Sequence, residues 1–303
     1  MSEHLVRSFY RDSMRVGAFL LVGLTLAAPI FVLRQAWTLA DVVAAALTTA
    51  LFIASVEVSN HRYFAHRTFK THRITQFFMG LGSVLTFQRS PLWWASTHRR
   101  HHAHADAEED CHAPRHGFVH AYWRWIYHSP CADIDPKLVK DLRAFPELVA
   151  LDRLHPLINA AYVFGLWSVF GFESVVVFFV VPVVITSHVI FGTNYFCHLD
   201  GFGYRSHRTG DHSRNSVIFA LLAAGQGWHN NHHKFPSYAR AGLEPGELDW
   251  GYLIICGLEA LGLIWDVRRP RPSRSVSTAP AVPGRMAAAR QSSHGSALHR
   301  GIE

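Results

Sequence analysis

The sequence is poor in charge and in cysteine. Charged residues make up 17% of its 303 residues, whereas soluble domains carry roughly 25%, and hydrophobic residues reach 49%. The four cysteines lie far apart and form no C-x-x-C pair. A disulfide framework and a thiolate zinc site are therefore not indicated, and the composition predicts a membrane protein in a reducing compartment.

The positive charge is concentrated at the C-terminus. From Val267 onward there are seven arginines and one acidic residue, Glu303, so this tail supplies +6 of the net charge of +7. Its content of Pro, Ser and Ala predicts disorder, and its charge suits anionic lipid headgroups. We therefore expect a disordered basic tail over residues 267–303 and no nucleic-acid partner.

Apolar runs predict four transmembrane helices, over residues 16–33, 37–56, 157–172 and 174–193. Residues 1–15 predict an uncleaved amphipathic segment on the cytoplasmic side. Two weaker stretches, 74–87 and 252–265, predict interfacial helices. The expected fold is an all-α integral membrane domain over residues 16–266, with a cytoplasmic helical cap that holds a histidine-rich di-metal site.

Lysine and arginine predict the orientation of these spans. Of the 29 such residues only Arg34, between the first two spans, falls on the opposite side, which leaves 28 on one side. The positive-inside rule then places both termini and both large polar regions in the cytoplasm. We expect a multi-pass protein of a bacterial inner membrane, with a cytoplasmic active site.

Histidine is abundant, with 22 copies, and three clusters stand out. They consist of His61 and His66, of His98, His101 and His102, and of His229, His232 and His233. The i, i+3, i+4 spacing of the last two places three imidazoles on one helix face. The i, i+5 spacing of the first turns its residues about 140° apart on a regular helix, which predicts a bent or frayed helix end.

The expected topology brings all three clusters to one side of the membrane, which predicts a single site. Eight histidines exceed the three or four ligands of one zinc ion, and no thiolate is nearby. Two redox metals with imidazole ligands suit the set better, and O₂ chemistry favours iron. A carboxylate-bridged di-iron bundle is not indicated, because E-x-x-H occurs once, from Glu109 to His112.

Three segments carry a resemblance: HRYFAHRTFKTHR, THRRHHAHADAEEDCHAPRHGF and GQGWHNNHHKFPSYAR. They resemble the three histidine boxes of the integral-membrane fatty acid desaturases, above all the stearoyl-CoA (Δ9) desaturases and their bacterial relatives, over about residues 16–266. The resemblance implies two non-haem irons and O₂-dependent removal of two hydrogens from a saturated acyl chain near C9. It also implies acyl-CoA or a membrane lipid as carrier, and a separate electron donor of ferredoxin, rubredoxin or cytochrome b5 type with its reductase.

The resemblance assigns metal ligation to nine histidines: His61, His66, His98, His101, His102, His198, His229, His232 and His233. It places Asn194, Asp110, His112, Arg115 and Gln226 around these ligands, and it predicts no catalytic residue beyond the ligands. Gln226 departs from the family pattern, since the third box often carries glutamate there. His198 has an alternative, structural interpretation as the cap of a helix C-terminus.

Two other functions are compatible with the residues. A fatty acyl hydroxylase or acetylenase on the same scaffold would use the same oxidant. A histidine-rich membrane metal transporter or sensor is the alternative from another class, but transporters place ligands near the membrane midplane, whereas these clusters flank the spans. Product analysis would decide the first alternative and metal analysis the second.

Overall fold

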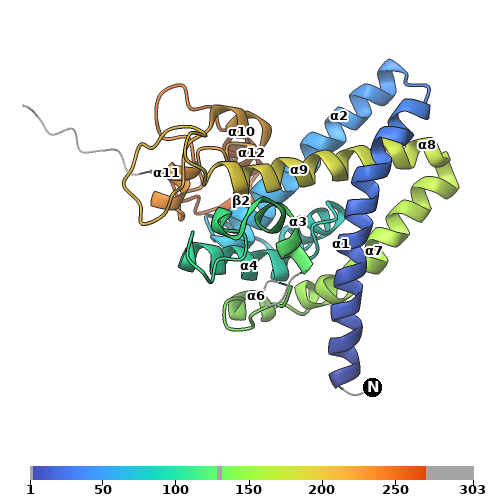
Figure 1. Cartoon of the computed structure of the whole chain (residues 1–303), viewed down its shortest axis with the longest axis horizontal. Helices are drawn as coiled ribbons and strands as arrows, with labels where there is room; N and C mark the ends of the chain where they lie inside the picture. Colours follow the sequence, from blue (N-terminus) through green and yellow to red (C-terminus); the bar gives the residue numbers. More distant parts are fainter. Residues whose placement is uncertain (1–2, 128–131, 271–303) are drawn as a thin grey trace, which may run out of the picture. The chain divides into compact units, whose positions relative to one another are not determined.

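Helices make up most of the structure, a computed structural model that describes residues 3–127 and 132–270 (Figure 1). The first compact unit of the chain ends at Pro270. Of the disordered tail expected over residues 267–303, residues 267–270 instead belong to this unit, with Arg268 hydrogen-bonded to Thr68 and Ala239. The rest of the tail and the side chains of residues 1–15 lie outside the described residues. The elements in chain order are α1 (Glu3–Arg34), α2 (Leu39–Ala54), η1 (Ser55–Ala65), β1 (Lys70–Thr71), α3 (Arg73–Leu85), α4 (Pro91–His104), η2 (Pro114–His116), α5 (Phe118–Tyr122), η3 (Arg124–Tyr127), α6 (Lys140–Arg143), α7 (Pro146–Phe170), α8 (Phe172–Val175), η4 (Val176–Val180), α9 (Val181–Phe196), α10 (Val217–Leu222), α11 (His229–Lys234), α12 (Trp250–Ala260) and β2 (Ile264–Trp265).

Two continuous helices are long and apolar enough to cross a membrane, judged by length and composition among the described residues. They are Leu39–Ala65, which joins α2 and η1, and Phe172–Phe196, which joins α8, η4 and α9. They correspond to the second and fourth expected spans. The apolar part of α1, Phe19–Arg34, is shorter, and the first half of α7 carries polar residues such as Asp152 and Arg153. The finding therefore supports two spans, and four spans remain a proposal.

Local sequence signals determine where the helices that carry the site begin. Thr38 and Asp41 form a capping box at the start of α2, with the Asp41 amide donating to the Thr38 hydroxyl at 3.2 Å. At the start of α4 the Ser90 hydroxyl accepts the amide of Trp93 at 3.2 Å, and Pro91 follows at the first helical position. The cap at Ser90 fixes where α4, which carries three of the histidines, begins.

The C-terminal part of the unit returns to the segment that follows η1. β2 pairs with β1 in an antiparallel arrangement, and the Arg268 amide donates to the Thr68 carbonyl at 2.8 Å. α4 packs on η1 and α7, α2 packs on α9, and α3 packs on α7. Figure 1 shows α10, α11 and α12 grouped at one end of this unit and the long helices α1 and α7 at the other. This unit thus has a cap region, which contains α10, α11 and α12, and a region of long helices, which contains α1 and α7.

The stretches expected to form interfacial helices are helical over most of their length, as α3 and α12, but the end of the second stretch forms β2 instead. One cysteine departs from expectation, because Cys111 is disulfide-bonded, whereas Cys197 and Cys256 are free. The spacing of the cysteines did not predict this bond.

Candidate metal centre

The first histidine cluster lies on a π-helix. A π-helix closes hydrogen bonds from residue i+5 to residue i, and the His66 amide donates to the His61 carbonyl at 3.2 Å at the end of η1. The wider turn places the two rings on the same side, with centroids 5.0 Å apart. The bent helix end expected from the i, i+5 spacing is therefore a widened helix.

The second and third clusters are each divided between two neighbouring groups. On α4 the Nε2 atoms of His98 and His102 lie 3.1 Å apart, and on α11 those of His229 and His233 also lie 3.1 Å apart. The i+3 member of each cluster turns toward the other helix. His101 Nε2 lies 3.3 Å from His233 Nε2, so α4 and α11 face each other across the site and contribute to both groups.

Nine histidines thus form two adjacent groups, and within each group the ligand atoms lie within 4.8 Å of one another. The five-histidine group consists of His61, His66, His98, His102 and His232, and the four-histidine group consists of His101, His198, His229 and His233. The rings of His102 and His233 stack at 4.5 Å between the groups. All nine residues that the resemblance selected are therefore in one place.

The nitrogen positions fit metal coordination. Neighbouring Nε2 atoms within the groups lie 2.9–3.3 Å apart. Two imidazole nitrogens bound to one metal at about 2.1 Å, roughly 90–100° apart, would lie about 3.0–3.2 Å from each other. The Nδ1 atom of His233 contacts a carboxylate, so the Nε2 atom of this neutral ring directs a lone pair at the Nε2 atom of His229. A cation between them removes this repulsion, and the nine side chains therefore fit two metal ions.

Burial keeps most of these imidazoles neutral. Burial, with the nearby His233 and Arg99, lowers the pKa of His66 to about 3. Burial also lowers the pKa of His233 to about 4, although Asp211 opposes the shift. For His101, burial acts in the same direction, but Asp110 and other aspartates outweigh it and raise the pKa. Because neutral imidazole is the form that binds metal, the set is largely ready to bind at neutral pH.

His198 lies just beyond the end of α9. Its Nε2 is 2.9 Å from His229 Nε2, and its Nδ1 is 3.0 Å from Asp106. The helix ends at Phe196, so a turn, rather than a continued helix, directs the ring into the four-histidine group. This position favours the metal-binding interpretation of His198 over a helix cap.

Carboxylates contact several rings on the side away from the centre. Asp110, which the resemblance placed near the ligands, lies 3.0 Å from His101 Nδ1. Sequence reasoning missed three others: Glu57, Asp106 and Asp211. The i, i+4 spacing of Glu57 and His61 could have indicated the first. No sequence signal indicated Asp211, because it lies in the loop between α9 and α10.

Gln226 and Asn194 both lie beside the centre. The Gln226 side chain is buried between the two groups, with Nε2 3.4 Å from His61 Nε2 and from His229 Nδ1. Asn194 lies in the last turn of α9 and lines a large cavity together with His98.

His112 and Arg115 differ in position. The buried His112 ring lies 4.4 Å from the His101 ring, so it belongs to the surroundings of the four-histidine group. Arg115 is exposed and pairs with Glu108 at 3.4 Å, and the structure does not bring it to the histidines.

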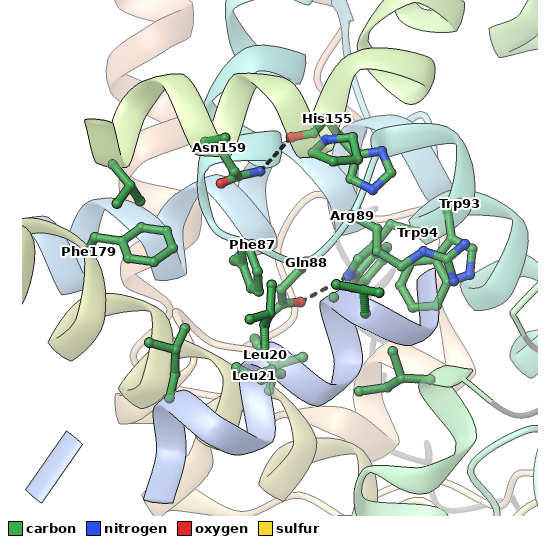
Figure 2. A pocket seen from close by; sticks show the side chains of 18 of the residues that line it. Leu20, Leu21, Phe87, Gln88, Arg89, Trp93, Trp94, His155, Asn159 and Phe179 are labelled. Carbon is green, nitrogen blue, oxygen red and sulfur yellow. Dashed lines mark hydrogen bonds between the residues drawn. The ribbon is translucent and has the colours of Figure 1, made fainter. Parts of the chain in front are cut away.

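A cavity of about 990 Å³ reaches the five-histidine group at His98. Figure 2 shows Leu20 and Leu21 of α1 on one side of this cavity and Asn159 of α7 on the other. Its lining is mainly apolar, and the Asn159 amide is engaged with the His155 carbonyl at 2.9 Å. A cavity of this size and lining suits a long apolar ligand.

The fold and the site together define a helical protein with a buried, all-imidazole centre suited to two metals and an apolar cavity that reaches it. The sequence model of the fatty acid desaturase family matches residues 10–244, and the chain belongs to that family. This result confirms the expected family.

Several named desaturases and an acetylenase are similar to the chain over most of its length. It is 37% identical to the sn-1 stearoyl-lipid 9-desaturase of Anabaena variabilis over 211 residues (69% of this chain, 76% of that protein). It is 33% identical to the Delta-9 acyl-lipid desaturase 1 of Arabidopsis thaliana over 239 residues (76% and 77%). It is 31% identical to a hex-5-enoyl-acyl-carrier-protein acetylenase of Moorena producens over 242 residues (73% and 74%). The chain spans 60% and 59% of the length of two chloroplastic desaturases of Arabidopsis thaliana.

Proposed function

We propose that this protein is an O₂-dependent acyl desaturase that introduces a double bond near C9 of a saturated chain carried by a membrane lipid. The reaction converts –CH₂–CH₂– to –CH=CH– and, with O₂, two electrons and two protons, yields two molecules of water. The observation that carries the proposal is the apolar cavity that reaches the nine-histidine centre. The position near C9 and the lipid carrier follow relatives named as 9-desaturases of lipids.

The protein's own residues have three tasks in this reaction. The nine histidines would hold two iron ions, which supply the activation of O₂ needed to cleave unactivated C–H bonds. The cavity walls, including Trp94 and Phe179, orient the acyl chain and exclude water. The carboxylates on Nδ1 hold the rings in the orientation that directs Nε2 inward.

The shape of the cavity supports a membrane lipid as the carrier. Leu20 of α1 and Phe164 and Trp167 of α7 line the cavity and are also 53%, 62% and 57% exposed. Residues that line a cavity and remain exposed mark its opening, so the cavity opens between α1 and α7. If both helices cross the bilayer, as the four apolar runs predict, an acyl chain can enter sideways while its headgroup stays at the membrane surface.

The proposal includes the topology and the electron supply. Four spans, with both termini and the metal centre on the cytoplasmic side, follow from the apolar runs and from the distribution of lysine and arginine. A separate donor of ferredoxin, rubredoxin or cytochrome b5 type, with its reductase, supplies the two electrons. A metal transporter fits the cavity poorly, because an apolar path to the site does not suit an ion.

Expression in a host that lacks unsaturated lipids, followed by mass spectrometry of its lipids, tests the function. A desaturase product has lost two hydrogens near C9, and His98→Ala should abolish it. His104→Ala is the matched control, because His104 is an exposed residue of the same helix. A product that has gained oxygen would identify a hydroxylase, and no change in any lipid would refute acyl oxidation. A triple-bonded product would instead support the acetylenase alternative, which one relative's name favours.

A further inference from the structure

The two histidine groups differ in the charge that lies behind them. In the four-histidine group, three of the four rings contact an aspartate through Nδ1. These contacts are His101 to Asp110 at 3.0 Å, His198 to Asp106 at 3.0 Å, and His233 to Asp211 at 2.9 Å. Three negative side chains therefore surround one group.

The five-histidine group has a single carboxylate behind it. Glu57 lies 3.0 Å from His61 Nδ1. Across residues 3–127 and 132–270, no carboxylate forms an ion pair or hydrogen bond with the other four rings, those of His66, His98, His102 and His232. The larger group is thus the less negative one.

The three aspartates are fixed in place by further hydrogen bonds. Asp106 accepts the His212 amide at 2.7 Å, and Asp110 accepts the Asp106 amide at 3.0 Å. Asp211 accepts the Ser213 amide at 2.9 Å. The loop after α4 and the loop between α9 and α10 are therefore folded so that their carboxylates face histidine rings, which distinguishes them from mobile surface acids.

The fourth ring of the four-histidine group has a neutral partner. His229 Nδ1 lies 3.4 Å from the Gln226 amide nitrogen, while the Gln226 oxygen is buried and has no hydrogen-bond partner among the described residues. A half-turn of the terminal amide exchanges its oxygen and nitrogen without moving the rest of the side chain. With the amide turned over, the oxygen accepts the Nδ1–H of His229, so every ring of this group has an acceptor on Nδ1.

We propose that the two metal positions are unequal, and that the four-histidine group binds its ion first and more tightly. An anionic acceptor on Nδ1 makes imidazole a stronger donor, and loss of such a partner costs about 10–100-fold in metal affinity. The four-histidine group has three aspartates behind its rings and the five-histidine group has one glutamate. We therefore expect the four-histidine group to have the higher metal affinity, although it has one ring fewer. The inference rests on the metal-binding part of the proposed function and is independent of the acyl substrate.

Stepwise metal binding tests this inference. The full-length protein in detergent is stripped with a chelator and titrated anaerobically with Fe²⁺, and bound iron is measured after competition with chelators of graded strength. We expect two steps, with about one ion per chain retained at intermediate chelator strength. Simultaneous loss of both ions would overturn the inference and leave the desaturase proposal intact, because lipid profiling of the same cells reports that function separately.

Substitutions of the carboxylates test which histidine group is responsible for each metal-binding step. Asp211→Asn should weaken the tighter step by about 10–100-fold and leave the weaker step nearly unchanged, whereas Glu57→Gln should weaken only the looser step. Asp200→Asn is the control, because this exposed aspartate pairs with Arg214 and forms no hydrogen bond or ion pair with any of the nine histidines. Circular dichroism confirms that each variant is folded, and Asp211→Glu should restore part of the lost affinity. Loss of the tighter ion in Glu57→Gln, or no effect in Asp211→Asn, would refute the assignment.

Discussion

The metal centre and the apolar cavity are built in different ways. At the centre, short motifs in η1, α4 and α11 and at the end of η1 supply eight rings, five of which are buried, and most ring nitrogens have a near neighbour within about 3 Å. The cavity is instead enclosed by side chains from α1, α4, α7 and the η4 segment, which are far apart in the sequence. The centre therefore tolerates almost no change, whereas the cavity can vary in shape. We infer that the centre determines the chemistry and that the cavity determines which chain is oxidised.

The largest effect is expected from a substitution in the metal centre. His198→Ala removes the ring that contacts His229, so we expect desaturation to fall by at least about 100-fold and bound iron to fall from about two to about one per chain. Metal analysis of the purified protein and lipid profiling of the cells measure the two effects. His104→Ala should change neither quantity. Full iron content and full activity in His198→Ala would show that this residue only caps α9.

A change in the cavity should have a smaller and more selective effect. Val163→Trp adds bulk to the α7 wall, so product from long chains should fall by about 10-fold while bound iron stays at the wild-type level. Competition between acyl chains of different length, measured by gas chromatography, should show a shift toward shorter chains. An equal loss for all lengths together with loss of iron would mean that the cavity and the centre are a single structural unit.

Acid should destabilise the centre of the metal-free protein. The folded-state pKa values of His66, about 3, and His233, about 4, lie below the ordinary value of 6.5. Below pH 6.5 the unfolded chain therefore binds more protons, and the free energy of unfolding decreases as the pH falls from 6.5 toward 4. The raised pKa of His101 acts in the opposite direction, but the lowered group also includes His98, His102, His229 and His232.

Thermal unfolding in detergent at about pH 7.5 and about pH 5.5 measures this effect. The metal-free protein should lose stability at the lower pH, and bound metal should reduce the loss because it competes with protons for the same nitrogens. Equal stability of the metal-free protein at both pH values would contradict the prediction that these rings are held neutral.

The smallest effect is expected far from both regions. Thr38→Ala removes the capping box of α2 and should lower the free energy of unfolding by about 1 kcal/mol. Iron content, chain-length preference and activity should all stay unchanged. A change in any of these three would show that the start of α2 is coupled to the metal centre at its other end.

The sequence by itself determined which residues form the centre. Imidazoles at i, i+3 and i+4 must share a helix face, so His98, His101 and His102 were predictable, as were His229, His232 and His233. The three boxes in order also indicated the family. Apolar runs located the long helices, although helix length and composition support only two of the four predicted spans.

Only the tertiary structure decided how these residues are shared and supported. The widened turn of η1 brings His61 and His66 together, and the i+3 histidines of α4 and α11 join the opposite group from their neighbours because the two helices face each other. Asp106 and Asp211 reach their rings from loops. The cavity likewise depends on distant elements meeting. Spacing along one helix fixes directions within that helix, whereas contacts between segments depend on how the whole chain packs.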